Sequence, residues 1–247
     1  MKKLFIISPV IFLLVLAFSS GAEAIAGTYT TNFPLTENLI SEGHNWINGG
    51  TVGLDWTNVS TTPGLAIGHE GGYVSFTDAT AILTGTWGPT QTVQATVYTV
   101  NQKDECYQEV ELRLRSTLSA HSSTGYEISF KCSKSSHAYM AIVRWNGRLG
   151  NFTYLAQYRG AQYGVANGDT VKAMIVGNTI TVYINGVQRG AATDSTYSGG
   201  NPGMGFNLGG TGLPQCIGTN GDYGFTSFTA SDEAEALSPP RNLRVLH

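Results

Sequence analysis

Residues 168–187 read GDTVKAMIVGNTITVYINGV, and this stretch indicates the fold more clearly than any other. Two short runs rich in β-branched and apolar residues, Thr170 to Val176 and Thr179 to Ile184, have the composition of β-strands. Gly177 and Asn178 separate the two runs, and a two-residue connection of this type is typical of a β-hairpin. We therefore predict a hairpin at this point.

Runs of the same kind recur through the rest of the chain, bounded by Gly, Asn, Asp and Pro. No stretch of the chain after its N-terminal segment holds the helical period for three turns, and the Gly-rich segment from Ser198 to Gly212 reads as a loop. The further predicted strands are Gly72 to Phe76, Thr92 to Thr99, Gln108 to Ser116, Tyr126 to Cys132, Tyr139 to Trp145, Phe152 to Gln157 and Tyr223 to Ala230. This number and spacing of strands predicts an all-β fold, a two-sheet antiparallel sandwich or jelly roll in a single domain.

The N-terminus has the three parts of an export signal. Lys2 and Lys3 precede an apolar run from Leu4 to Phe18, and Ala22-Glu23-Ala24 supplies small residues for cleavage. The apolar run is short for a membrane span, so we expect a secreted protein, extracellular or periplasmic, without membrane insertion. The predicted segments are a signal peptide at 1–24, the jelly-roll domain at 25–230 and a linker-like tail at 231–247.

The charge balance gives no reason to expect nucleic acid or an anionic membrane as a partner. Lys and Arg total 14 against 17 Asp and Glu, a net charge of −3, so nothing favours nucleic acid. Charged residues form only 13% of the chain, and uncharged, hydroxyl-rich surfaces are common on exported sugar-binding proteins. Composition therefore leans weakly towards carbohydrate recognition.

The hairpin at 168–187 also resembles the central hairpin of laminin-G-like domains in the concanavalin-A-like lectin and glucanase superfamily. The resemblance continues through Gly203-Met204-Gly205-Phe206 and the last strand, Phe225-Thr226-Ser227-Phe228. It implies a concanavalin-A-like jelly roll. Because this superfamily includes lectins, carbohydrate-binding modules, glucanases, lyases and adhesion domains, the fold does not decide the function.

The segment Gln108 to Arg115 alternates apolar and polar residues without a break. With its apolar residues facing the core, Glu109, Glu111, Arg113 and Arg115 share the opposite face. One interpretation is an ordinary solvated sheet face with ion pairs between neighbours. The other is the floor of a sugar-binding groove, which jelly rolls of this superfamily commonly place on the concave sheet.

The next strand, Tyr126 to Cys132, pairs with this one in either of two registers. The first sets Cys106 opposite Cys132, as a disulfide requires, and sets Glu111 opposite Glu127. Two carboxylates about 5 Å apart repel each other, so one pKa should rise, as the acid of a retaining glycosidase requires. This register predicts a Cys106 to Cys132 disulfide and a catalytic pair, Glu111 and Glu127.

The second register is displaced by two residues. It pairs Glu109 with Lys131 and Arg113 with Glu127, which favours simple ion pairs. The register therefore separates the two interpretations of this face. Laminarinase-type glucanases of the superfamily that this chain resembles carry three acidic residues on alternate positions of one strand. Here Glu109 and Glu111 match the first two positions, and Arg113 stands in the third.

A lyase acting on an acidic glycan is a further enzymatic alternative. Glu111-Leu112-Arg113 resembles part of a strand motif of alginate-lyase-type jelly rolls, in which Arg neutralises the uronate carboxylate. Such chemistry needs a nearby base, and spacing singles out none of the available residues. The candidate bases are His121, His137, Tyr154 and Tyr158.

Aromatic side chains supply a second means of binding sugars, since their faces stack on sugar rings without charge. Trp145, Tyr154, Tyr158 and Tyr163 are candidates. Trp145 shares a strand phase with Ala141 and Val143, which favours burial, so we expect Arg144 on the other phase to face the groove.

Cysteine and acidic patterns give little support to a cofactor. The three cysteines, Cys106, Cys132 and Cys216, form at most one internal pair and show no zinc-ligand spacing. Asn220-Gly221-Asp222 offers few oxygen ligands to calcium. We expect no metal or cofactor in the site and leave a structural calcium ion open.

These patterns lead to one leading function and two alternatives. We expect extracellular carbohydrate recognition, with a polysaccharide or cell-surface glycan held across the concave sheet. The expected ligand-binding residues are Glu109, Glu111, Arg113, Arg115, Glu127 and Arg144. The alternatives are a polysaccharide lyase or glycoside hydrolase, and a structural or adhesion domain.

Overall fold

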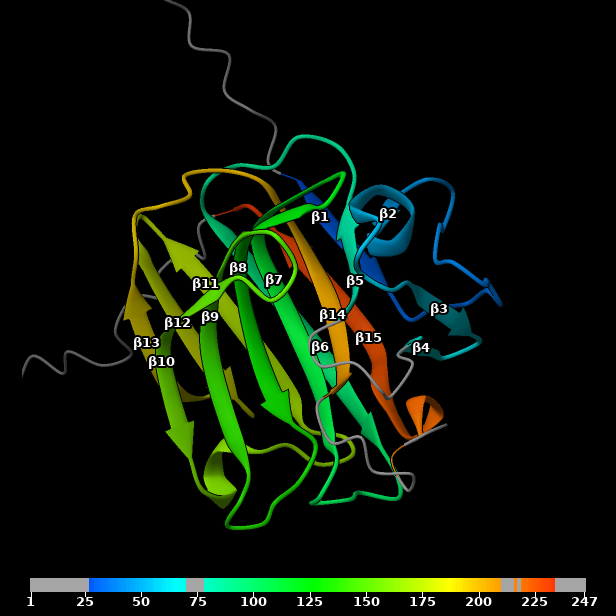
Figure 1. Cartoon of the computed structure of the whole chain (residues 1–247), viewed down its shortest axis with the longest axis vertical. Helices are drawn as coiled ribbons and strands as arrows, with labels where there is room; N and C mark the ends of the chain where they lie inside the picture. Colours follow the sequence, from blue (N-terminus) through cyan, green and yellow to red (C-terminus); the bar gives the residue numbers. More distant parts are fainter. Residues whose placement is uncertain (1–26, 70–77, 210–215, 217–218, 234–247) are drawn as a thin grey trace, which may run out of the picture.

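The computed structural model describes residues 27–69, 78–209, 216 and 219–233. The predicted signal peptide, the predicted strand Gly72 to Phe76 and the tail beyond residue 233 lie outside these residues. Two antiparallel sheets pack face to face (Figure 1). The prediction of an all-β two-sheet sandwich is confirmed.

One sheet, here the β6 sheet, has eight strands. Its hydrogen-bonded order is β13 (Val187–Thr193), β12 (Thr179–Ile184), β11 (Thr170–Val176), β6 (Gln91–Thr99), β15 (Tyr223–Ser231), β4 (Leu65–Gly68) and β3 (Val59–Thr62), with β1 (Thr28–Thr31) also paired to β15. The predicted hairpin is confirmed, because Val176 pairs with Thr179 across Gly177 and Asn178.

The other sheet, here the β7 sheet, has seven strands. Its order is β10 (Phe152–Arg159), β9 (Tyr139–Gly147), β8 (Ser122–Lys131), β7 (Tyr107–Ser119), β14 (Asn201–Gly209), β5 (Ala79–Leu83) and β2 (Trp46–Asn48). Short helical turns are η1 (Gly49–Gly53), η2 (Ala161–Tyr163) and η4 (Asn220–Asp222). Among the described residues, no helix is long and apolar enough to span a bilayer.

The core lies between the sheets and explains the alternation along β7. Val110, Leu112 and Leu114 are fully buried in the core, where each side chain contributes about 1.5–3 kcal/mol by leaving water. The intervening residues of β7 therefore face away from the core. In this way the sequence period directs Glu109, Glu111 and Arg113 to the open face of the β7 sheet.

The segment 198–212, predicted as a loop, instead contains the strand β14 between β7 and β5. Two glycines of this strand, Gly203 and Gly205, allow neighbouring atoms to approach closely. A Cβ atom at Gly203 would lie 2.4 Å from the carbonyl oxygen of Ala81 on the neighbouring strand. Gly-rich composition is therefore a requirement of the central position of β14, and the prediction of a loop is wrong for Asn201–Gly209.

The pairing of β7 with β8 follows the second of the two predicted registers. Glu109 lies opposite Lys131 and Arg113 opposite Glu127. Cys132 falls beside Gln108, whose carbonyl accepts its backbone N–H, and not opposite Cys106. The disulfide joins Cys106 to Cys216, and Cys132 is a free, buried thiol. The predicted disulfide between Cys106 and Cys132 is therefore wrong.

Candidate functional site

The open face of the β7 sheet carries a cavity of about 370 Å³. Strands β7 to β10 and β14 supply most of its lining, and Asp78 enters from the residue before β5. Its polar lining residues are Asp78, Glu109, Glu127, Ser129, Gln157, Arg159 and Asn207, and its aromatic ones are Tyr107, Tyr139, Trp145, Phe152 and Tyr154. We call this cavity the groove.

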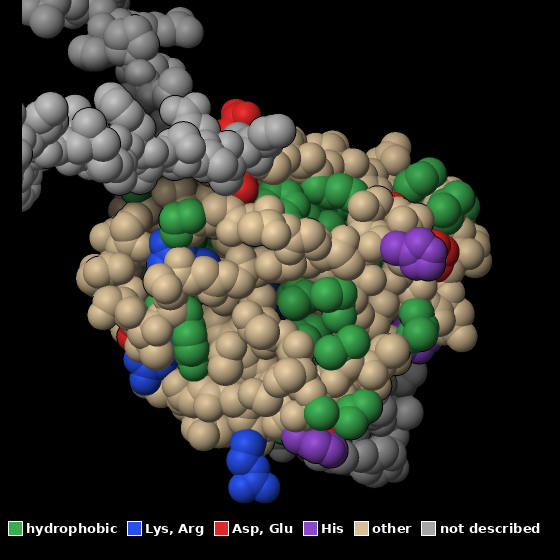
Figure 2. Space-filling model, turned by 90° about the horizontal axis from the view of Figure 1, so that it is seen from above, with side chains coloured by type: hydrophobic (Ala, Val, Ile, Leu, Met, Phe, Trp, Pro, Cys, Tyr) green, Lys and Arg blue, Asp and Glu red, His purple; other side chains and the backbone are tan. Residues whose placement is uncertain are grey.

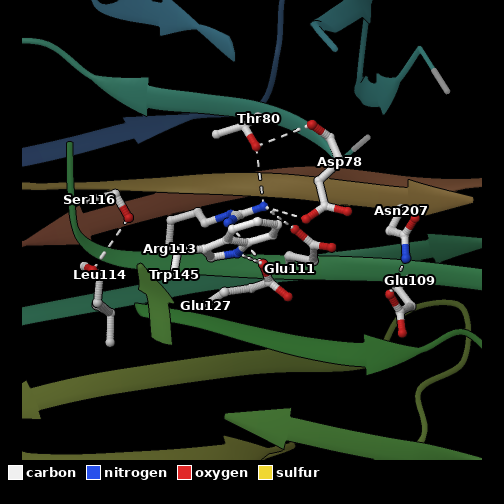
Figure 3. Close-up of polar contacts among 10 residues, drawn as sticks. All are labelled: Asp78, Thr80, Glu109, Glu111, Arg113, Leu114, Ser116, Glu127, Trp145 and Asn207. Carbon is white, nitrogen blue, oxygen red and sulfur yellow. Dashed lines mark hydrogen bonds and ion pairs between the residues drawn. The ribbon is translucent and has the colours of Figure 1, made fainter. Parts of the chain in front are cut away.

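Beneath the groove, Arg113 is surrounded by acidic side chains (Figure 3). Its Nη2 atom lies 2.6 Å from Glu111 Oε2 and 3.3 Å from Asp78 Oδ2, and its Nη1 lies 2.9 Å from Glu127 Oε2. Nη2 also donates a hydrogen bond to Thr80. Burial lowers the pKa of Arg113, but the three carboxylates raise it by more, so the pKa is higher than usual and Arg113 stays charged.

Trp145 covers this buried ion cluster. The Arg113 guanidinium lies 5.7 Å from the centre of the indole ring, and the indole N–H donates to Glu127. Trp145 also packs edge-on against Trp56 and Phe152. Its burial is as predicted, yet it faces the groove side of the sheet and not the core between the sheets.

Glu109 lies at a second polar position in the groove. Its Oε1 accepts a hydrogen bond from the Tyr139 hydroxyl. Its Oε2 accepts one of 2.7 Å from the Asn207 amide (Figure 3). Burial raises the pKa of Glu109 from the ordinary 4.5 to about 7. The Lys131 ammonium lies above the rings of Tyr107 and Tyr139 close by.

Glu111 occupies a different environment from the carboxylates that line the groove. It is fully buried and does not line the groove, and its Oε1 has no hydrogen-bond partner in the described part of the chain. Burial, and then the neighbouring Asp78 and Glu127, raise its pKa well above the ordinary value. A substrate in the groove therefore cannot contact Glu111 directly, which argues against a catalytic pair of Glu111 and Glu127.

Two predicted groove residues lie elsewhere. Arg115 follows an irregularity in the pairing of β7, with a φ of 47°, and its guanidinium donates to the backbone carbonyls of Pro89, Gly177 and Tyr197. Arg144 lies opposite Tyr126 on the other face of the sheet and pairs with Asp194 at 2.6 Å. These positions correct the prediction of Arg115 and Arg144 as groove ligands.

A bulge in β10 decides which of its residues reach the groove. The pairing with β9 shifts between Tyr154 and Ala156, so Tyr154, Gln157 and Arg159 share the groove face. The same shift turns Tyr158 away, and its hydroxyl bonds to the backbone of Ala191. Of the predicted stacking residues, Trp145 and Tyr154 therefore line the groove.

The remaining predicted candidates lie away from the groove. Tyr163 packs on Tyr158, which the bulge has turned aside. His121 stands on the tight turn between β7 and β8, paired with Asp55, and His137 precedes β9 in an exposed loop. This leaves Tyr154 as the one predicted lyase base that lines the groove.

Three acidic residues around Arg113 have the spacing of metal ligands. One oxygen each of Asp78, Glu111 and Glu127 lie within 4.8 Å of one another, close enough to hold a cation. The Arg113 guanidinium already contacts all three carboxylates, and a metal ion there would face its positive charge. The residues thus fit an internal guanidinium better than a metal ion. At η4, Asp222 accepts a hydrogen bond from Asn101, and calcium binding there stays untested.

The sequence did not reveal several groove residues, which are Asp78, Tyr139, Asn207, Gln157 and Arg159, nor Thr80 in the ion cluster beneath. Asn207 lies opposite Glu109 on β14, where the Gly-rich composition obscured the strand. The alternation of Met204, Phe206 and Leu208 was the available indication, since these three are buried.

The fold and the groove define a concanavalin-A-like jelly roll with a polar groove on one sheet, and solved structures agree on the fold. No family model matches the chain, and no curated protein matches it either. The carbohydrate recognition domain of Emp46p in its potassium-bound form is 10% identical, with a TM-score of 0.53, over 83% of this chain and 96% of that one. The carbohydrate-binding module CBM66 from Bacillus subtilis is 12% identical, with a TM-score of 0.50, over 79% of this chain and 96% of that one. At sequence identities this low, the structural similarity establishes the fold and leaves the activity open.

Proposed function

We propose that this protein binds a carbohydrate chain in the groove of the β7 sheet. The observation that carries the proposal is the combination of carboxylates on the floor with exposed aromatic rings at the rim. Glu109 and Glu127 offer acceptors to sugar hydroxyls, while Tyr107 and Tyr154 remain 45% and 51% exposed. Acceptors that fix hydroxyls and rings that stack on sugar faces are the two elements of a sugar site.

Two further observations support the proposal. The Emp46p domain and CBM66, whose fold this chain shares, are named for carbohydrate recognition and carbohydrate binding. Figure 2, which views the molecule from above, shows few charged side chains among the described residues of that face; most of it is backbone and side chains that are neither charged nor hydrophobic. Such a surface suits a hydroxyl-rich ligand better than a polyanion.

We also propose that the protein acts outside the cytoplasm, on a polysaccharide or a cell-surface glycan. The N-terminal pattern of Lys2, Lys3 and the apolar run to Phe18 supports export. The Cys106 to Cys216 disulfide supports an oxidising compartment. Detection of the chain in the culture medium or periplasm, cleaved near Ile25, tests this part.

Retention on immobilised polysaccharides tests the binding function. The side chain of Tyr154 makes no hydrogen bond among the described residues and is half exposed, so Tyr154→Ala should leave folding intact. We expect about 10-fold weaker retention, equivalent to about 1.4 kcal/mol of lost stacking. The matched control is Tyr183→Ala, which removes a tyrosine from the outer face of the β6 sheet. Equal retention of wild type and Tyr154→Ala, or no retention of the wild type on any glycan, would refute the proposal.

Glycoside hydrolysis is the second candidate function. Glu109 lines the groove with a pKa raised by burial to about 7, which suits a general acid, and Glu127 lines the same groove. New reducing ends released from a retained glycan would establish cleavage. Glu109→Gln should then abolish it, and activity that survives this substitution would exclude Glu109 as the acid.

A further inference from the structure

The cations around the groove floor are already occupied within the protein. Arg113 is 1% exposed and is bound by Asp78, Glu111 and Glu127. Lys131 is also buried, and its ammonium donates to the carbonyl of Asp104. Arg113 cannot turn towards a carboxylate or sulfate of a ligand without leaving buried carboxylates unpaired, and Lys131 would give up its hydrogen bond to Asp104 to do so.

The groove presents an excess of hydrogen-bond acceptors. The carboxylates of Asp78, Glu109 and Glu127 line it and are all at least nine-tenths buried. The Asn207 Oδ1 atom beside Glu109 is also buried and lacks a partner among the described residues. A ligand that reaches this floor must therefore bring donors, and sugar hydroxyls are donors.

A single lining cation, Arg159, stands among the described groove residues, and it lies on the edge strand β10. It is exposed, like its neighbour Gln157 on the same face of the strand. Both can donate hydrogen bonds to hydroxyl oxygens at the rim. Arg159 can meet an anionic group of a ligand only at the rim, where solvent and salt weaken the attraction, because Arg113 and Lys131 have partners within the protein.

From this arrangement we propose that the glycan bound in the groove is neutral, without uronate or sulfate groups, and donates hydroxyls to Glu109 and Glu127. The inference rests on the proposed carbohydrate-binding function and narrows its ligand class. An anionic glycan would place its charge against carboxylates that are already desolvated, which raises the cost of contact. The internal pairing of Arg113 also removes the basis for a lyase that uses Arg113 to neutralise a uronate.

The test compares two polymers that differ in charge alone. A neutral polysaccharide retained by the wild type is lightly carboxymethylated, and half of the product is converted to its methyl ester. Affinity is measured for both at low and high salt. We expect the charged polymer to bind at least about 10-fold more weakly than its ester, with a smaller difference at high salt.

Two charge variants locate the repulsion in the groove. Measured at pH 8, above the pKa of about 7 of Glu109, Glu109→Gln replaces the carboxylate with an amide of the same shape and removes one negative charge, so it should reduce the difference between charged polymer and ester. Arg159→Gln removes the lining cation and should increase that difference. Equal or tighter binding of the charged polymer, or retention confined to natural uronans in the panel, would overturn the inference while leaving carbohydrate binding intact. Failure to retain any glycan would instead refute the proposed function, and this inference with it.

Discussion

Single residues beneath the groove show how burial controls charge in this protein. Arg113 neutralises part of a group of largely buried carboxylates, and Trp145 packs over its guanidinium. Pairs of this kind contribute little net stability, because desolvation offsets attraction, but the loss of one partner is costly. The geometry of Glu127 on the groove floor therefore depends on a residue that no ligand touches.

Glu109 makes the stability of the protein depend on pH. Its pKa is about 7 in the folded chain and 4.5 ordinarily. Between pH 4.5 and pH 7 the native state therefore keeps a proton on Glu109 that the unfolded chain has released. The stabilisation is fully present below pH 4.5 and is lost as the pH rises through 7, by about 3 kcal/mol. Glu111, whose pKa is also raised, acts in the same direction. We therefore expect the free energy of unfolding to fall from pH 5 to pH 8.

Urea unfolding of Glu109→Gln at several pH values measures this contribution. The variant should show a shallower decline, with the remaining slope due to Glu111. Glu105→Gln, at an exposed position shortly before Glu109, is the matched control and should keep the wild-type slope. A wild type equally stable at pH 5 and pH 8, or a variant with an unchanged slope, would show that Glu109 ionises without cost.

At the scale of elements, the central strand β14 needs glycine at positions where no side chain fits. A Cβ atom at Gly205 would lie 2.3 Å from Glu111 Oε2 and 3.0 Å from Arg113 Nη2. Gly205→Ala must therefore displace the ion cluster, and we expect a loss of about 1–3 kcal/mol in stability together with weaker glycan retention. Gly199→Ala, where a Cβ would meet nothing within 4 Å, is the control. Wild-type stability and retention in Gly205→Ala would mean that the cluster tolerates displacement.

The strands that could be predicted from sequence share one property, a local pattern strong enough to stand alone. β7 and the β11 to β12 hairpin carry such patterns, and the structure confirms them. β14 carries no such pattern, because its glycines are required by contacts with neighbours that are distant in sequence. The short strand β5 is buried on every residue and so lacks the alternation that marks a half-exposed strand.

The same distinction separates the predicted part of the groove from the rest. Glu109, Glu111 and Arg113 share a face because of one strand's period, and this was predictable. The irregularity after Leu114 that removes Arg115 depends on tertiary contacts. Asn207 reaches the groove from β14 and Asp78 from the residue before β5, so only the sheet order brings them to Glu109 and Glu127.

At the scale of the whole molecule, the disulfide ties the start of β7 to the segment that follows β14. Cys106 and Cys216 are 110 residues apart, and the loop between them contains β7 to β14. Closing a loop of this size restricts the unfolded chain, which stabilises the native fold by about 2–5 kcal/mol. Because Tyr107 and Glu109 follow Cys106 directly, the bridge also anchors the end of the groove that holds them.

Removal of the bridge should therefore affect the whole fold, and the three cysteines permit a sharp design. We expect Cys106→Ala and Cys216→Ala each to lower the free energy of unfolding by about 2–5 kcal/mol, and the double variant to lose little more than either one. Cys132→Ala removes a free buried thiol and should lose less, with the bridge intact in peptides mapped without reduction. Additive losses in the double variant would show that the two residues act independently. A mapped bridge to Cys132 would contradict the register of β7 on β8, and with it the position of Glu127 beside Arg113, because both follow from the same strand pairing.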